Sequence, residues 1–297
     1  MKYIKIFKEH SLYDASKSEL EYPSLSYCEK ENEVHYMPSN SVMFYVGDLS
    51  GKTDQTVVIN YSGGTHDTVS IPEPNKWYTH NIPNGKTLSS VTNLDYIKEA
   101  VVNCDVANMQ SWKNVDKVSY YNCDILGGNG INFGFSMTKF LDVRTLGTSN
   151  LTDMSNMFWQ CGSLKSLDVS NFDTSNVTKM GQFVYNCKGL TSLDLSNFNT
   201  SNVTSMWYMF GFCDSLTSLD LSNFNTSNVT TMFHMFGYCT NLTSLDLSGW
   251  DMTNVTDMTD MFDYCNSLTT IRMVGCNQAT IEKIKAVKPS SATIITE

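Results

Sequence analysis

The sequence has no run of basic residues and no apolar stretch near the about 20 residues that a membrane-spanning helix needs. Its formal net charge at pH 7 is −10. These features argue against nucleic acid or an anionic membrane as a partner, and against membrane insertion. Residues 1–10 carry some positive charge but lack the apolar segment of a secretory signal. We therefore expect a neutral or basic partner.

Motifs of common catalytic and metal sites are also missing. The sequence contains no C-x-x-C and no H-E-x-x-H spacing, and its five histidines are scattered. Its carboxylates recur at equivalent positions, whereas an active site needs one cluster of acid, base or nucleophile. The sequence therefore predicts a protein that is not an enzyme and that holds no cofactor.

What the sequence does contain is a repeat of 26 residues. Cysteine, leucine and methionine recur together at this interval. The repeated residues are Cys161, Cys187, Cys213, Cys239 and Cys265; Leu164, Leu190, Leu216, Leu242 and Leu268; and Met154, Met180, Met206, Met232 and Met258. Fixed self-similarity of this length predicts a solenoid, in which each unit buries its apolar side against copies of itself.

One unit shows how the repeat should fold. Leu216, Leu219 and Leu221 place apolar side chains on one side of a short extended run, which predicts a strand. Ser222–Asn228 is rich in Ser, Asn and Thr and predicts a turn. The next apolar residues have the i, i+3, i+4, i+7 spacing of one helical face, which predicts a short helix. They are Met232, Met235, Phe236 and Cys239, after Thr230 as a candidate N-cap.

Runs such as LTSLDLSNFNTSNVTSMWYMFGFC resemble the bacterial-surface-protein type of leucine-rich repeat, called BspA-like. The resemblance covers roughly Thr138 to Cys276. It implies an α/β leucine-rich-repeat solenoid, with parallel strands on one face and short helices on the other. Proteins of this family are mostly non-enzymatic surface or adhesion proteins, so the resemblance also implies a binding role.

Three parts are expected along the chain: a docking segment (1–40), a small antiparallel β domain (41–93), and the solenoid (94–297). The β domain and the solenoid are expected to have separate cores. Upstream, Cys104–Val106 and Cys123–Ile125 match Leu141–Val143 as apolar-Asp-apolar motifs, which predicts irregular N-terminal repeats. At the other end, Arg272 replaces the repeated acid and residues 281–296 predict a C-terminal cap.

The phrase YPSLSYC at residues 22–28, followed by EVHY at residues 33–36, resembles leader segments of virion and tail-associated proteins of phages infecting gut Bacteroidales. It implies a virion protein, fibre, tail or capsid decoration, whose N-terminal part anchors it in an oligomeric assembly. The solenoid would then bind the host surface, protein or glycan, or neighbouring structural proteins. A virion protein needs no signal peptide, which favours this reading. The alternative is a cell-surface or secreted bacterial adhesin.

A file of acids recurs along the predicted strands, and we call it the acidic ladder. Its members are Asp105, Asp124, Asp142, Asp168, Asp194, Asp220 and Asp246. At a strand spacing of about 4.8 Å, neighbouring charges repel by about 0.9 kcal/mol in a water-like dielectric. Three kinds of compensation stay open: hydrogen bonds from nearby hydroxyls with counter-ions, Ca²⁺ bridging adjacent carboxylates, or a basic partner.

A candidate partner-binding cluster lies where the repeats diverge. Trp207, Tyr208, Phe233 and His234 occupy two neighbouring positions on adjacent repeats. Aromatic residues are rich contact residues at interfaces and on sugar rings. The other interpretations are that a neighbouring domain or subunit covers them, or that they lie flat against the rim of the solenoid.

The repeated cysteines predict a buried file of free thiols that pack as small hydrophobic residues. Five equivalent cysteines in a row cannot all pair, although metal or redox roles stay open for them. Cys28 lies outside this file.

Overall fold

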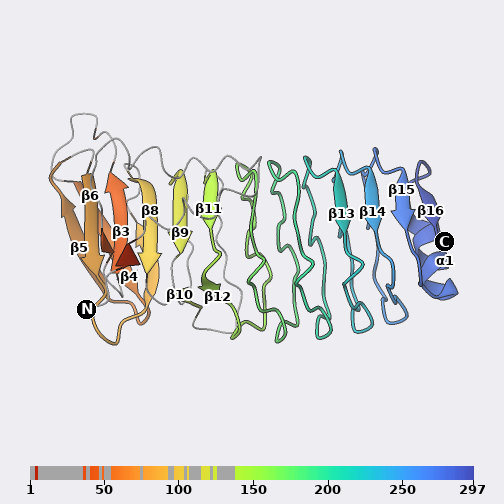
Figure 1. Cartoon of the computed structure of the whole chain (residues 1–297), viewed down its shortest axis with the longest axis horizontal. Coiled ribbons are helices and arrows are strands. Elements are labelled where there is room, and N and C mark those ends of the chain that lie inside the picture. Colours follow the sequence, from red (N-terminus) through yellow and green to blue (C-terminus); the bar gives the residue numbers. More distant parts are fainter. Residues whose placement is uncertain are drawn as a thin grey trace.

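The computed structural model describes residues 4–5, 36–37, 41–46, 49, 55–73, 76–92, 97–103, 106, 115–120, 123–125 and 138–297. The molecule is an elongated solenoid, with antiparallel strands at one end and a helix at the other (Figure 1). The solenoid and the small antiparallel sheets that precede it confirm the predicted architecture. No helix in the described ranges is long and apolar enough to cross a membrane.

One long face of the solenoid carries two sheets (Figure 1). The first has the order β11–β9–β8–β3–β6, in which β3 is antiparallel to both neighbours and the other pairs are parallel. The second, β13 to β16, is all parallel. Their bounds are β3 Ser41–Val46, β6 Lys76–Asn81, β8 Ile97–Asn103, β9 Lys117–Tyr120, β11 Phe140–Asp142, β13 Ser218–Asp220, β14 Ser244–Asp246, β15 Thr270–Arg272 and β16 Thr293–Ile295.

A second file of strands lies beside the first. An antiparallel sheet has the order β5–β4–β7, and β7 continues into the solenoid because Leu88 bridges Val106 and Val106 bridges Ile125. Strand β10 then pairs with β12 in parallel, and a further small pair joins β1 to β2. The bounds are β1 Ile4–Lys5, β2 Tyr36–Met37, β4 Gln55–Tyr61, β5 His66–Ile71, β7 Leu88–Thr92, β10 Cys123–Asp124 and β12 Leu146–Gly147.

The hydrophobic core does not divide at the boundary predicted near residue 93. Strand β3 pairs with β8 over its whole length, from Ser41 opposite Asn103 to Val46 opposite Ile97. Buried apolar residues from Val42 to Ala292 form one contiguous cluster. The separate cores expected for the two parts are therefore replaced by one core, in which the antiparallel strands close the N-terminal end of the parallel stack.

The short helices expected in the repeats are wrong, because each repeat instead makes two successive four-residue turns. In one copy, Met209 N donates to Met206 O at 3.2 Å and Cys213 N donates to Phe210 O at 3.3 Å. The third residue of each turn has a positive φ, 50° at Tyr208 and 59° at Phe212. Among the described residues, the one helix is α1 (Gln278–Val287) in the C-terminal cap.

Hydrogen bonds between repeats explain why turns replace the helix. Alternate amides of this segment donate to the next repeat, as Tyr208 N does to Phe233 O at 2.8 Å and Phe210 N to Met235 O at 3.0 Å. A helix would direct these groups along its own axis. Left-handed backbone costs a non-glycine residue about 1–2 kcal/mol, a cost that these bonds between repeats offset. The apolar residues are the first and last of each turn, a spacing that also fits a helical face.

Buried polar side chains also join the repeats. Thr174 Oγ1 donates to Asn199 O at 3.1 Å and accepts from Asn199 N at 2.8 Å, and Thr148, Thr200 and Thr226 occupy equivalent buried positions. Where Met252 interrupts this file, its amide instead donates to Thr280 Oγ1 of α1 at 2.9 Å. The cap helix thus supplies a hydroxyl acceptor to a backbone amide of the preceding repeat.

The file of free, buried thiols is confirmed by the structure. Cys187 and the three later members each donate from Sγ to a carbonyl of the preceding repeat, at 3.0–3.1 Å. Burial raises the pKa of Cys213 and of Cys265 to about 12. These thiols therefore stay protonated and serve as donors within the core. Cys28 and Cys104 lie outside the described residues.

Candidate partner-binding surface

The structure brings the four predicted aromatic residues together on the turn segments of two adjacent repeats. Tyr208 stacks on His234 with ring centroids 4.6 Å apart and planes within 3°. The Phe233 and Trp207 rings each lie edge-on to the Tyr208 ring, with centroid separations of 5.4 and 6.0 Å respectively. His234 is buried, whereas Trp207, Tyr208 and Phe233 are half-buried. Their clustering is as the sequence predicts, and their role in binding stays a prediction.

The cluster is part of a larger surface that sequence analysis missed. Tyr185 lies edge-on to both Tyr208 and Phe212, at 5.4 and 5.3 Å. Phe212, Tyr238 and Tyr264 form a stack with centroid separations of 4.2 and 4.5 Å. We call the combined set the aromatic strip: Tyr185, Trp207, Tyr208, Phe212, Phe233, His234, Tyr238 and Tyr264. The signal was present in the sequence, since Phe212, Tyr238 and Tyr264 are 26 residues apart.

Glycines make room for the rings of the aromatic strip. A Cβ on Gly181 would lie 2.0 Å from Nε1 of Trp207, and one on Gly211 would lie 2.7 Å from Cδ1 of Tyr208. A Cβ on Gly237 would lie 2.8 Å from Nδ1 of His234. Each glycine therefore provides a seat for a ring of its own or the following repeat. This arrangement restricts the positions that the rings can take.

We expect Gly181→Ala to displace the Trp207 ring without unfolding the protein, because the clash is with a side chain. The fluorescence of Trp207 is obtained by subtracting the spectrum of the Trp207→Phe variant. In Gly181→Ala this emission should shift towards that of an exposed indole. Gly162→Ala is the matched control, since its Cβ would make an ordinary contact of 3.6 Å with Asn186 O. An unchanged spectrum in Gly181→Ala would contradict the close packing of the Trp207 ring against Gly181.

Charges are distributed unevenly along the aromatic strip. Near its N-terminal end, Lys179 lies 3.9 Å from Asp153 and Lys188 lies 3.6 Å from Asp214. At the C-terminal end, Asp260 faces Nε2 of His234 at 3.4 Å. Nδ1 of His234 is buried and has no hydrogen-bond partner among the described residues. The acids at this end thus lack the lysine partners found earlier in the strip.

The acidic ladder lies on the strand face and is stabilised mainly by its own turns. Asp168 and Asp220 each accept hydrogen bonds from the amide and the hydroxyl of the serine two residues later, at 2.7–3.0 Å. Asp194 and Asp246 accept from the amides of Ser196 and Ser248, both at 2.9 Å. The two hydroxyl contacts are the kind of hydrogen bond that the sequence offered as one form of compensation, whereas the amide contacts were not predicted.

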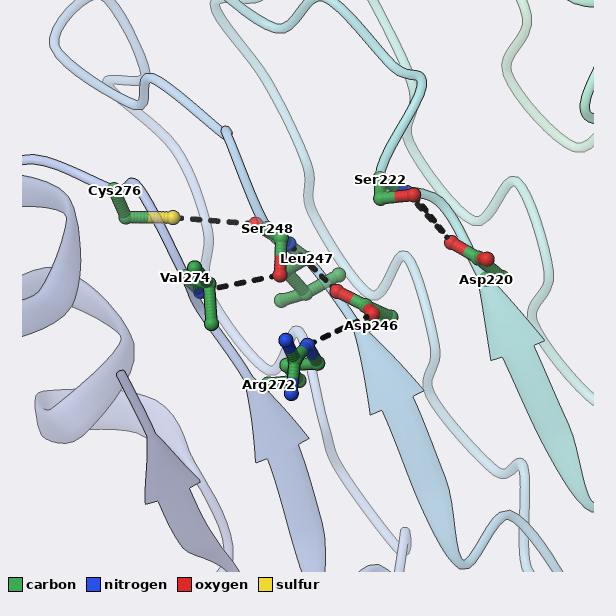
Figure 2. A network of polar contacts seen from close by, with 8 residues as sticks. All are labelled: Asp220, Ser222, Asp246, Leu247, Ser248, Arg272, Val274 and Cys276. Atoms are coloured by element: carbon green, nitrogen blue, oxygen red, sulfur yellow. Dashed lines mark hydrogen bonds and ion pairs between the residues drawn. The ribbon is translucent and has the colours of Figure 1, made fainter. Parts of the chain in front are cut away.

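Arginines flank the ladder at both ends. Asp142 pairs with Arg144 through Nε at 3.0 Å and Nη2 at 2.8 Å. Arg272 stands opposite Asp246 in the register of β14 and β15, with Nε 3.5 Å from Oδ2 (Figure 2). Ser248 extends the network, because its hydroxyl accepts from Val274 N at 3.1 Å (Figure 2).

The register corrects the predicted ladder at Asp124. Asp142 lies opposite Ser119, whereas Asp124 lies opposite Gly147 in a different sheet. The equivalent of Gly147 in the next repeat is Asp173, a turn residue. The apolar-Asp-apolar motif occurs in two different files of strands of the solenoid. The interval of 18 residues between Asp124 and Asp142 therefore does not connect equivalent positions. Asp105 lies outside the described residues.

Hydrogen bonding lowers the pKa of Asp220, one member of the acidic ladder. The Ser222 hydroxyl and then the Ser222 amide hold the pKa of Asp220 below its usual value, although burial and the negative charge of Asp194 act in the opposite direction. The hydrogen bonds from Ser222 therefore have a larger effect on the pKa of Asp220 than the negative charge of Asp194 in the neighbouring repeat. No group of three or more His, Cys, Asp or Glu that could hold a metal ion occurs within the described residues.

We expect Ser222→Ala to raise the pKa of Asp220 towards the value of a free aspartate, because it removes one of two hydrogen bonds to Oδ1. In the wild type, the lowered pKa stabilises the fold above the unfolded pKa of about 3.9, and this contribution is lost as pH falls through the folded pKa. Titration of the Asp220 carboxyl by ¹³C NMR measures the change. Ser196→Ala is the control, since Asp194 accepts from the Ser196 amide.

Comparison with known proteins places the repeats in a family. Residues 131–219 and 194–287 match the family described as "Mycoplasma protein of unknown function, DUF285". These matches span more than half of the chain, so the protein belongs to this family. Together with the solenoid, they support the BspA-like repeat type recognised from the sequence. A search of curated proteins found no match.

Proposed function

We propose that the protein is a non-enzymatic binding protein, displayed on a surface, and that it holds its partner on the aromatic strip. The observation that carries this proposal is a set of eight aromatic rings gathered on the turn segments of four consecutive repeats. Tyr264 is 54% exposed although its ring is large and apolar. Aromatic groups of this kind dominate the energetics of protein interfaces. The surface-repeat family supports a surface or extracellular location.

The binding test compares two aromatic sites on different faces of the full-length protein. Fluorescently labelled protein is applied to gut bacterial cells and to mucin-coated surfaces, and its dissociation constants are measured. The double variant Trp207→Ala/Phe233→Ala is expected to bind at least about tenfold more weakly, the range of a hot spot. Phe140→Ala is the matched control, since Phe140 is 37% exposed at the start of β11 on the strand face. Equal binding by both variants would overturn the proposal.

Two places of display are proposed for this binding protein. The family match supports a bacterial cell surface, and the phrase at residues 22–36 supports a phage virion through its resemblance to virion proteins. Mass spectrometry of purified phage particles and of washed cell surfaces separates them. Structural copy numbers in particles would support the virion and residues 1–40 as the docking segment. Recovery from intact cells alone would support the adhesin.

A further inference from the structure

The last full repeat differs from its neighbours in what its turns present. Asp260 and Asp263 occupy positions that hold His234 and Gly237 one repeat earlier, and Asp257 lies just before them. The Asp260 side chain is 54% exposed. Within residues 138–297, all of which the structure describes, no lysine or arginine lies within 4.0 Å of these three carboxylates. This end of the aromatic strip therefore carries negative charge beside which no lysine or arginine lies, although Asp257 accepts a hydrogen bond from the Thr259 amide at 3.1 Å.

Aromatic rings lie beside these carboxylates. Tyr264 is adjacent to Asp263 in the chain and stacks on Tyr238 at 4.5 Å. Burial, the Tyr264 hydroxyl, Asp263 and Asp260 together raise the pKa of Tyr238, so these groups share one electrostatic environment. His234 pairs through Nε2 with Asp260, and its buried Nδ1 has no partner in the described part of the chain. The site thus combines aromatic rings and carboxylates.

The geometry of the rings restricts the class of ligand. A sugar ring stacks on the open face of an aromatic side chain. Here Phe212, Tyr238 and Tyr264 stack face to face, with interplanar angles of 6° and 18°, so Tyr264, the last ring of the file and 54% exposed, has one face that no other ring of the file covers. Carboxylates repel an anionic ligand. A cation gains from both groups, through the π system of a ring and through a charge-assisted hydrogen bond to a carboxylate.

We propose that the C-terminal end of the aromatic strip, formed by Tyr238, Tyr264, Asp260 and Asp263, binds an arginine side chain of a partner protein. Guanidinium fits better than ammonium, because its planar fork stacks on aromatic rings and donates two parallel hydrogen bonds to carboxylates. The formal charge of −10 favours the approach of a basic partner. This inference rests on the proposed function, since it names the chemistry that the binding surface recognises.

Titration of the full-length protein with a short arginine-containing peptide tests the site. The comparison peptide replaces arginine by citrulline, which keeps the shape and removes the charge. We expect the citrulline peptide to bind at least tenfold more weakly by calorimetry at low salt. The variant Asp260→Asn/Asp263→Asn should lose at least tenfold in affinity for the arginine peptide. Asp194→Asn/Asp220→Asn, which removes the same charge from the strand face, should change it less than twofold.

Several outcomes would overturn the arginine site. Equal affinity for the two peptides would exclude recognition of charge, and equal loss in the two double variants would indicate nonspecific attraction. Competition by neutral glycans but not by the arginine peptide would assign the strip to sugars. Thermal melting of each variant confirms that it is folded. If Trp207→Ala/Phe233→Ala still abolishes surface binding while the arginine peptide fails to bind, only this inference falls. If the wild type binds no surface, the proposed function falls.

Discussion

Replacing Phe210 by alanine should destabilise the protein by about 3–5 kcal/mol, the usual cost of removing a large ring from a packed core. Phe210 is fully buried and stacks on Phe236 with centroids 5.6 Å apart. Phe236 stacks in turn on Phe262 at 5.5 Å. Phe210 is the first of these three stacked rings, so a cavity there removes its contact with Phe236 in the next repeat.

Phe212→Ala is the control, since it removes the same side chain two residues later on the aromatic strip. Phe212 is half-buried and packs on Tyr185 and Tyr238 at the surface. Its loss should cost only about 1 kcal/mol, because neighbouring rings can relax into solvent-exposed space. Urea unfolding of both variants provides the free energies. Similar values for the two would contradict the inward and outward assignment of the turn residues.

Deletion of residues 1–93 should abolish cooperative folding of the N-terminal half of the solenoid. The deletion removes β3, which pairs with β8 along its length, and β7, whose Leu88 bridges Val106. Buried Ala100 and Val102 would then face solvent beside an unpaired strand edge. An open parallel edge of this kind is prone to aggregation. Size-exclusion chromatography and circular dichroism measure the loss.

The matched control deletes residues 213–238, one whole repeat. Phe212 is then followed by Cys239, so every later residue keeps its register on the stack. Stability of a solenoid is close to a sum over repeats and their interfaces. The shorter protein should therefore fold cooperatively with reduced stability. A folded, monomeric product from the deletion of residues 1–93 would show that the antiparallel strands are not needed as a cap.

The 26-residue interval was enough to predict the solenoid, its buried cysteines and the acids between Asp142 and Asp246. The second face could not be predicted from the same pattern. Residues such as Met206, Met209, Phe210 and Cys213 have the spacing of a helical face. They are also the first and last residues of two consecutive turns. Left-handed φ values at Tyr208 and Phe212 decide between the two, and they depend on hydrogen bonds to the next repeat. Local sequence does not contain that information.

The sequence predicted only part of the aromatic strip. Trp207, Tyr208, Phe233 and His234 attracted attention because aromatic residues fall together at two diverging positions. The roles of Gly181, Gly211 and Gly237 as seats for rings required coordinates, since each depends on a side chain from its own or the following turn. The error at Asp124 has another origin, because a short motif cannot show which of several parallel files its strand has joined.

The file of buried thiols allows the separation of individual repeats to be detected. Burial raises the pKa of Cys187 and Cys239 well above the usual value of a thiol, so these groups do not react while their carbonyl partners remain in place. Separation of two neighbouring repeats, by heat or by pulling on the ends of the molecule, would expose one thiol at a known position. A thiol-directed label would then record, residue by residue, where along the molecule the stack first came apart.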